Sequence, residues 1–419
     1  MRRPKVVIIG PCADPTDVGE ALSTFRWTKG IAEHADVTLL TYVKSGRSSA
    51  KSALPGVRVI EWNDLPIPAR LERLNAALHP GYAVFYLKAR RWLKRSLAAG
   101  ESFDLVHQVA PLALRYPSPA AGLPIPLIVG PLAGSLTTPE SFAAETAGDP
   151  WFVKLRRFDQ CRFRHDPFLR RTYETAATLI GVAPYVRDIL ADVKIRDFAL
   201  ENETGVPELP PLPARDFAAR PFRLLYVGRI VRTKGVRDAV RAMTHLADLD
   251  VRFDVVGAGN DLDACKAEAA SLGVADRVHF HGRKSRAEVD PFYRDAHAFL
   301  FPSFREPSGN VVLEAMSWGL PMVVADRGGP SYAVTDAVGT RVPVRTPTEF
   351  ARGLADAVRA LVASPELAAR QSHAARTTVE TEHLWPAKIG RMLALYERVL
   401  GARSAPTSTT NANARLGAA

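Results

Sequence analysis

The segment Phe301–Gly329, FPSFREPSGNVVLEAMSWGLPMVVADRGG, contains two carboxylates, Glu306 and Glu314, separated by seven residues. The Ser-Gly-Asn turn between them leads into an apolar periodic run, a pattern that predicts the N-terminus of a helix. The first N–H groups of a helix have no intrahelical partners and can bind an anion. The segment therefore suits a ligand with a phosphate at the helix end and hydroxyl groups for the two carboxylates, such as a nucleotide sugar. The residues expected at this helix end are Ser308, Gly309, Asn310 and Val311.

Two glutamates at this spacing also occur by chance on solvated surface loops, so the neighbouring segments decide between the two interpretations. Upstream lie LYVGR at 225–229 followed by Lys234-Gly235, FDVVGAG at 253–259, and VHFHG at 278–282. In this order, and followed by Glu-x7-Glu, they resemble the retaining family 4 glycosyltransferases, which have the GT-B fold. The resemblance is strong from about Phe222 to Pro343 and weaker over the first half of the chain.

The length of 419 residues is too great for one ordinary core and predicts two domains of about 200 residues each. Short β runs alternate with amphipathic helices in both halves; in the second half we expect strands at 222–227, 251–256 and 322–325 and a helix at 347–363. This alternation predicts an α/β fold with two doubly wound, Rossmann-like parallel-sheet domains facing an interdomain cleft. We expect an acceptor-side domain at 1–206, a nucleotide-sugar-binding domain at 207–383 and a disordered tail at 401–419. The resemblance implies a GT-B protein whose final helix, 384–400, packs back on the first domain.

The second half offers several candidate contacts to a donor. Arg229 and Lys234 follow the strand expected at 222–227 and precede a helix, a position where two cations suit a diphosphate, although both could simply be solvated surface residues. Gly228 directly follows the same strand and is a further candidate. Gly257 begins a Gly-x-Gly pattern that fits a phosphate loop or a tight turn. Arg283 resembles the family position where backbone groups meet the nucleobase.

The first half offers two candidates. The resemblance implies glycines near the donor phosphate in the first loop, and here a single Gly19 stands where family members often have two. A lone glycine can equally serve only as a turn. The strand expected at 103–107 ends in His107, which resembles a family histidine near the sugar, whereas a lone histidine at a strand end is by default structural.

The chain is basic, with 55 Lys and Arg against 44 Asp and Glu and a net charge of +11. Basic residues mix with aromatic ones at 69–99 and 151–171, and we expect each of these segments to form a helix. Such segments could contact an anionic membrane or a lipid-phosphate acceptor, or simply present a solvated basic face. No nucleic-acid-binding motif accompanies them, so we expect no nucleic-acid partner.

The N-terminus, MRRPKVVIIG, predicts a first strand and not a signal peptide. No apolar run is suited to span a bilayer as a helix. We expect a cytoplasmic protein, with peripheral contact to the inner face of the cell membrane as an option.

We expect no metal and no cofactor besides a nucleotide-diphosphate sugar as donor substrate. The two Asp-x-Asp pairs, at 248–250 and 261–263, lie at expected helix ends where Asp commonly caps. The three cysteines, Cys12, Cys161 and Cys265, have no metal-site spacing.

The resemblance implies retaining transfer of a sugar to a glycan or lipid-linked acceptor, as in cell-envelope polysaccharide or glycolipid synthesis. In this interpretation Glu314 binds the ribose hydroxyls, Glu306 orients the sugar, and Arg229 and Lys234 stabilise the leaving diphosphate. No residue is assigned as nucleophile or general base. Two alternatives stay open: a nucleotide-sugar epimerase on the same fold, and a non-catalytic protein that binds a nucleotide sugar or acts as a membrane scaffold.

Overall fold

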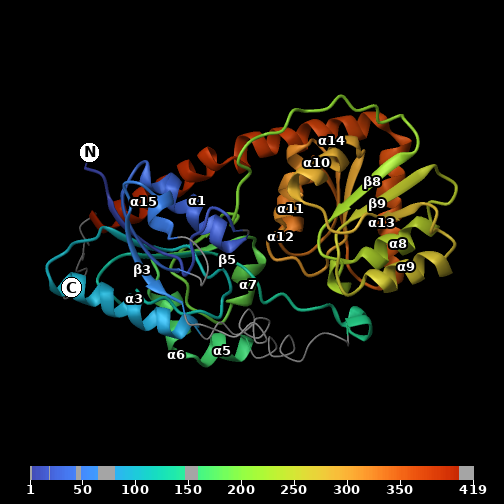
Figure 1. Ribbon diagram of the computed structural model, residues 1–419. Helices are drawn as coiled ribbons and strands as arrows, with labels where there is room; N and C mark the ends of the chain where they lie inside the picture. Colours follow the sequence, from blue (N-terminus) through green and yellow to red (C-terminus); the bar gives the residue numbers. More distant parts are fainter. Residues whose placement is uncertain (1, 18, 44–48, 65–80, 147–158, 405–419) are drawn as a thin grey trace, which may run out of the picture.

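The computed structural model describes residues 2–17, 19–43, 49–64, 81–146 and 159–404, and it confirms the predicted α/β class. The described residues form two parallel sheets flanked by helices, and the two domains lie side by side (Figure 1). The segments predicted as helix at 69–80 and 151–158, and as tail at 405–419, lie outside the described residues.

The first sheet has the strand order β3-β2-β1-β4-β5-β6-β7 within the described part of the chain. Its central strands are apolar runs buried on both faces, as parallel strands between two layers of helices should be. The strand order reverses between β1 and β4, so a crevice opens at the carboxyl ends of these strands. The strands are β1 (Lys5–Ile9), β2 (Asp36–Val43), β3 (Arg58–Asn63), β4 (Leu105–Gln108), β5 (Leu127–Leu132), β6 (Thr178–Gly181) and β7 (Phe198–Leu200). The helices are α1 (Glu20–Ala32), α3 (Gly81–Ala98), α5 (Asp159–His165), α6 (Pro167–Thr175) and α7 (Tyr185–Ile189).

The second sheet has the order β10-β9-β8-β11-β12-β13 among the described residues, and its strand order reverses between β8 and β11. The strands are β8 (Phe222–Val227), β9 (Val251–Val256), β10 (Val278–Phe280), β11 (Ala298–Phe301), β12 (Met322–Ala325) and β13 (Gly339–Val342). The helices are α8 (Val236–Thr244), α9 (Leu262–Ser271), α10 (Arg286–Asp295), α11 (Asn310–Ser317), α12 (Gly328–Ala333), α13 (Pro347–Ala363), α14 (Pro365–Thr378) and α15 (Trp385–Ser404).

The single helix predicted up to Arg171 is wrong in its described part, because the chain forms two helices there. Asp166 stands between α5 and α6, and its carboxylate accepts hydrogen bonds from the N–H groups of Phe168 (3.0 Å) and Leu169 (3.3 Å). Pro167 takes the first helical position, where its missing N–H costs nothing. The Asp166-Pro167 pair therefore starts a new helix within the segment predicted as a single helix.

The last helix, α15, returns to the first domain after the second domain is complete. Trp385 packs edge-to-face on Trp27 of α1, with ring centroids 5.1 Å apart. Further along, Ile389 lies directly over Gly30, where an added Cβ would come within 2.6 Å of the isoleucine side chain. The helix continues to Ser404, so the tail predicted to begin at residue 401 is helical over its first four residues.

A buried ion pair fixes α15 to the crossover between the domains. Lys388 is fully buried, and its Nζ donates to the Glu201 carboxylate and to the Asn202 carbonyl oxygen (2.9 Å). Arg391 donates to the same carboxylate at 2.9 Å. Removing one partner of a buried pair leaves an uncompensated charge and is costly. The crossover and α15 are therefore held as one unit.

Residues 137–146, between β5 and α5, lie against the second domain; we call them the 137–146 strap. Phe142 is fully buried there, with its ring centroid 4.5 Å from that of Phe304. Glu145 accepts from Arg232 at 2.9 Å and from Arg241 at 3.0 Å. A segment that the predicted boundary at 206 assigned to the first domain thus completes the core of the second.

Among the described residues, none of the helices combines the length and the apolar character needed to cross a membrane.

We expect Phe142→Ala to lower the free energy of unfolding by about 3–5 kcal/mol, because it removes a fully buried aromatic ring from the second core. Urea denaturation followed by circular dichroism measures the change. Phe168→Ala is the matched control, since that ring is 59% exposed and should cost less than about 1 kcal/mol. Equal losses in the two variants would show that the strap does not stabilise the second domain.

Candidate active site

The N-terminus of α11 lies at the carboxyl end of β11, next to the point where the strand order reverses. Gly309 precedes the helix with φ of 79°, a left-handed conformation that favours glycine. An added Cβ there would also lie 2.9 Å from Pro330 Cγ. The first-turn N–H groups near Asn310 and Val311 are therefore presented at a fixed position, as the sequence predicted.

Glu306 and Lys234 form a largely buried ion pair beside this helix end. Their side chains are 16% and 12% exposed, and Glu306 Oε1 also accepts from the Gly309 N–H at 3.3 Å. Lys234 ends a short helical turn after β8, and its Nζ lies 5.7 Å from the centroid of the Phe301 ring. Two residues that the sequence assigned to different roles are thus partners in one ion pair.

Glu314 lies one turn into α11. Its carboxylate accepts from the Tyr293 hydroxyl at 3.4 Å and lies 3.6 Å from an Arg286 guanidinium nitrogen. Burial raises the pKa of Glu314 above its usual value, and the Arg286 charge opposes that effect. The Glu314 carboxylate thus has one hydrogen-bond donor and one nearby cation among the described residues, and it can accept further hydrogen bonds.

A cavity of about 140 Å³ lies between the two domains, and Glu314 is one of the residues that line it. The first domain contributes Gly19 and neighbouring α1 residues, and the second contributes α10 and α11. This cavity is the predicted interdomain cleft, and we call it the interdomain cavity. Its lining includes Gly19, Leu22, Ser23, Arg26, Thr204, Gly205, Val206, Pro207, Arg286, Asn310, Leu313 and Glu314.

The remaining second-domain candidates lie on loops at the carboxyl end of the same sheet. An added Cβ on Gly257 would come 1.8 Å from the Gly228 carbonyl oxygen, so the loops after β8 and β9 touch and need glycine at this point. Arg229 and Arg283 are exposed after β8 and β10. Ser308, in contrast, is buried beneath the helix end, at 5% exposure.

The structure places His107 within the first sheet and not in this group, which favours the structural alternative for this residue. The imidazole is fully buried within the first sheet, with Nε2 2.8 Å from the Gly130 carbonyl oxygen and Nδ1 2.7 Å from the Tyr396 hydroxyl. Burial lowers the pKa of His107 to about 4, so the ring is neutral at pH 7. Both nitrogens are occupied, which makes His107 a structural link between the sheet and α15.

Glu203, which the sequence did not single out, is buried between the domains at 8% exposure. Its Oε1 accepts from the Asn310 side-chain amide at 2.9 Å, which joins the crossover to the first residue of α11. Burial raises the pKa of Glu203 to about 7 against the opposing hydrogen bond from Asn310, and the nearby carboxylates Glu20 and Glu306 raise it further. The local sequence is that of a solvated turn, so only tertiary contacts reveal this group.

The Asp-x-Asp pairs are engaged in ion pairs. Asp261 begins α9, but its carboxylate accepts from Arg237 at 3.0 Å and makes no cap hydrogen bond. Asp248 accepts from Arg359 at 2.6 Å. Across the described ranges, no group of three or more His, Cys, Asp and Glu side chains is placed to hold a metal ion.

Residues 214–378 match the family model described as "Glycosyl transferases group 1". We call this matched range the group 1 domain. Glycogen synthase from Mycobacterium tuberculosis (strain CDC 1551 / Oshkosh) is 32% identical over 177 residues, which are 42% of this chain and 42% of that protein. The match thus spans less than half the length of this curated relative. All the second-domain candidates lie inside the group 1 domain, whereas Gly19 and Glu203 lie outside it.

Solved structures match over nearly the whole chain and confirm the GT-B architecture. Sucrose-phosphate synthase from Thermosynechococcus elongatus gives a TM-score of 0.66 at 20% identity, covering 96% of this chain and 100% of that chain. Alr3699/HepE from Anabaena, solved in complex with UDP, gives a TM-score of 0.62 at 17% identity, covering 94% of this chain and 100% of that chain. At such identities the likeness establishes the fold, in which the group 1 domain is the second of two lobes.

We expect Glu203→Gln to remove a pH dependence of stability. The folded-state pKa of about 7 exceeds the usual 4.5, so the native protein retains a proton that the unfolded chain releases between these values. Wild-type stability therefore falls as pH rises from about 4.5 to 7, by up to about 3 kcal/mol relative to the glutamine variant. Urea denaturation at pH 5, 6, 7 and 8 measures the difference.

Glu397→Gln, at an exposed position on α15, is the control and should follow wild type at every pH. If Glu203→Gln also followed wild type, the carboxyl group would titrate normally and its burial between the domains would have no electrostatic consequence.

Proposed function

We propose that this chain is a retaining glycosyltransferase that moves a sugar from a nucleotide-diphosphate sugar to a glycan or lipid-linked acceptor, in cell-envelope polysaccharide or glycolipid synthesis. One observation carries the proposal: the nine residues 306–314 supply the Lys234-bound Glu306, a helix N-terminus and the cavity-lining Glu314. The group 1 domain and a structural neighbour solved with UDP support a nucleotide donor.

In the proposed donor complex, the diphosphate lies at the N-terminus of α11, where free N–H groups and the helix dipole favour an anion. Lys234 gives up its ion pair with Glu306 and binds a phosphate oxygen instead. Arg229, on the loop after β8, binds the same diphosphate. The released Glu306 carboxylate then accepts hydrogen bonds from sugar hydroxyls. Glu314 accepts from the ribose hydroxyls, held in orientation by Tyr293.

In the transfer step, the bond between the anomeric carbon and the donor phosphate oxygen breaks. The acceptor hydroxyl oxygen bonds to the anomeric carbon on the same face, and its proton moves to the departing phosphate oxygen. Lys234, Arg229 and the α11 N-terminus offset the negative charge that builds on the leaving group, which lowers the barrier. These groups supply the positive charge that a metal ion provides elsewhere, so we infer a metal-independent reaction.

Peripheral contact with an anionic membrane is part of the proposal. Helix α3 exposes Lys88, Arg91, Lys94 and Arg95, and Leu87 beside them is 65% exposed. Basic residues around an exposed apolar side chain favour binding at an anionic lipid surface.

We expect one class of UDP-, GDP-, ADP- or CDP-sugar to raise the melting temperature of the wild-type protein, with the same shift in EDTA. A ligand at a hundred times its dissociation constant stabilises the native state by about 2.7 kcal/mol. Glu314→Gln should abolish the shift, because its amide offers one acceptor oxygen in place of a carboxylate. Glu397→Gln, far from the cavity, should retain it.

The matched donor should then support transfer with retention of anomeric configuration, measured by NMR, and Lys234→Met should slow it by about 10²- to 10³-fold. An inverted product would overturn the retaining mechanism. Turnover of the nucleotide sugar without an acceptor would indicate an epimerase, and no shift with any donor would favour a non-catalytic scaffold.

For the membrane contact, we expect the protein to sediment with vesicles containing anionic lipid and not with neutral ones. Lys94→Glu combined with Arg95→Glu should reduce the bound fraction at least several-fold, since each basic residue near an anionic surface contributes about 1 kcal/mol. Equal sedimentation with both vesicle types would remove membrane contact from the proposal.

A further inference from the structure

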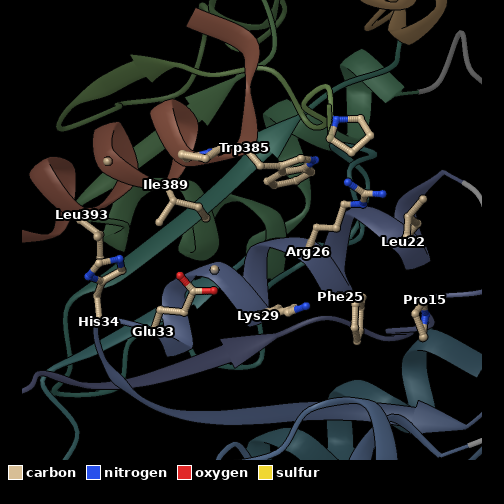
Figure 2. Close-up of a pocket in the computed structure, with 14 residues that line it drawn as sticks. Pro15, Leu22, Phe25, Arg26, Lys29, Glu33, His34, Trp385, Ile389 and Leu393 are labelled. Carbon is tan, nitrogen blue, oxygen red and sulfur yellow. The ribbon is translucent and has the colours of Figure 1, made fainter. Parts of the chain in front are cut away.

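A groove of about 710 Å³ runs between α1 and α15 on the first domain (Figure 2). We call it the α1/α15 groove. Its floor is apolar: Phe25, Trp385 and Ile389 line it and are each no more than 9% exposed. Leu22 and Leu393 add apolar surface along it. The volume lies within the range of roughly 300–1,000 Å³ that is typical of small-molecule sites.

The groove continues into the interdomain cavity. Leu22, Arg26 and Pro207 line both spaces, so one end of the groove opens beside Asn310 and Glu314. Figure 2 shows Arg26 and Leu22 towards one end and Glu33 and His34 at the other. A long ligand lying in the groove therefore reaches the region where the donor sugar would be transferred.

Positive charge concentrates where the two spaces meet. The Arg26 guanidinium lies 5.9 Å from the centroid of the Trp385 ring, and no carboxylate among the described residues forms an ion pair with it. Burial lowers the pKa of Arg26, and the facing Arg286 lowers it further. Arg286 belongs to the second domain, and its guanidinium also lies 3.6 Å from the Glu314 carboxylate. An anion between the two arginines would offset their repulsion.

Lys29 lies one turn after Arg26 on α1 and also lines the groove, whereas the acidic Glu33 lies a further turn away. The cations are thus at the end near the interdomain cavity, and the apolar floor extends away from it. This polarity fits a ligand with an anionic head and an apolar chain, oriented with its head towards the donor.

We propose that the acceptor is an anionic amphiphile, a hydroxyl-bearing group joined through a phosphate to an alkyl or isoprenoid chain, with the chain in the α1/α15 groove and the phosphate between Arg26 and Arg286. The inference rests on the proposed transferase function and names its acceptor class. Arg26 is then a specificity residue, because it favours an anionic head group over a neutral one. The apolar floor contacts only the chain and does not distinguish the two.

Gly390 offers a substitution that fills the groove without disturbing the fold. It lines the groove within α15, and an added Cβ there meets nothing within 4 Å. Gly390→Leu therefore places a side chain in the groove, and replacing glycine inside a helix favours the helix. Gly401→Leu is the matched control, since Gly401 lies on the same helix outside the groove and is equally free of neighbours.

Isothermal titration of the full chain with decyl phosphate, decanol and inorganic phosphate, each below any micelle concentration, tests the proposal. We expect decyl phosphate to bind at least tenfold more tightly than decanol or inorganic phosphate. Gly390→Leu should weaken decyl phosphate binding at least tenfold, Gly401→Leu should not, and Arg26→Gln should reduce decyl phosphate to the affinity of decanol.

Decyl phosphate binding that is unchanged in Gly390→Leu would overturn the proposal. So would equal affinities for decyl phosphate and inorganic phosphate, which would indicate an anion site without a chain site. Nucleotide-sugar binding is measured on the same preparations, so that failure of this proposal can be told apart from failure of the proposed function. If a nucleotide sugar binds and decyl phosphate does not, only the proposed acceptor class is wrong.

Discussion

The buried pair between Lys388 and Glu201 is the interaction on which the arrangement of the two domains depends. A fully buried ammonium is tolerated only when its charge is paired and its hydrogen bonds are made, and here the partners come from the crossover itself. The same lysine lies 5.2 Å from the centroid of the Trp27 ring. One residue of α15 therefore fixes the crossover, α1 and the last helix together, and the interdomain cavity and the groove both open beside it.

The candidate site uses the other constraint of the fold, the helix end that follows β11. The loops that follow the strands of a parallel sheet lie along one edge of that sheet. Because the strand order reverses between β8 and β11, the loops after these two strands diverge and leave a crevice at that edge. Lys234 and Glu306 form an ion pair beside this helix end, which keeps two largely buried charges paired. Glu203 extends this polar group across the domain boundary through Asn310.

The 137–146 strap adds a second connection between the domains, independent of α15. Its apolar anchor, Phe142, belongs to the core of the second domain, and Glu145 joins the ion pairs of Arg232 and Arg241. The guanidinium of Arg232 also lies over the Phe142 and Phe304 rings. The described chain therefore links the two lobes at the strap as well as at the crossover.

Much of the fold followed from local patterns. The bounds predicted for β8, β9, β12 and α13 coincide with those observed, because apolar runs ended by Gly or Asp, and Thr-Pro at a helix start, act within a few residues. The helix start between Glu306 and Glu314 was identifiable for the same reason. The strap and the two-helix break at Asp166 were not identified, the former because its partners are far away in sequence.

The sequence by itself determined the two parallel-sheet lobes and the helix end that faces the cleft, since both depend on spacing along the chain. Only the tertiary structure decided that His107 is a buried link and that Glu203 is a buried acid. It also decided that α1 and α15 enclose a groove ending at Arg26. Burial, pairing and the pKa of a side chain are set by neighbours that other elements bring to it, and no local pattern records them.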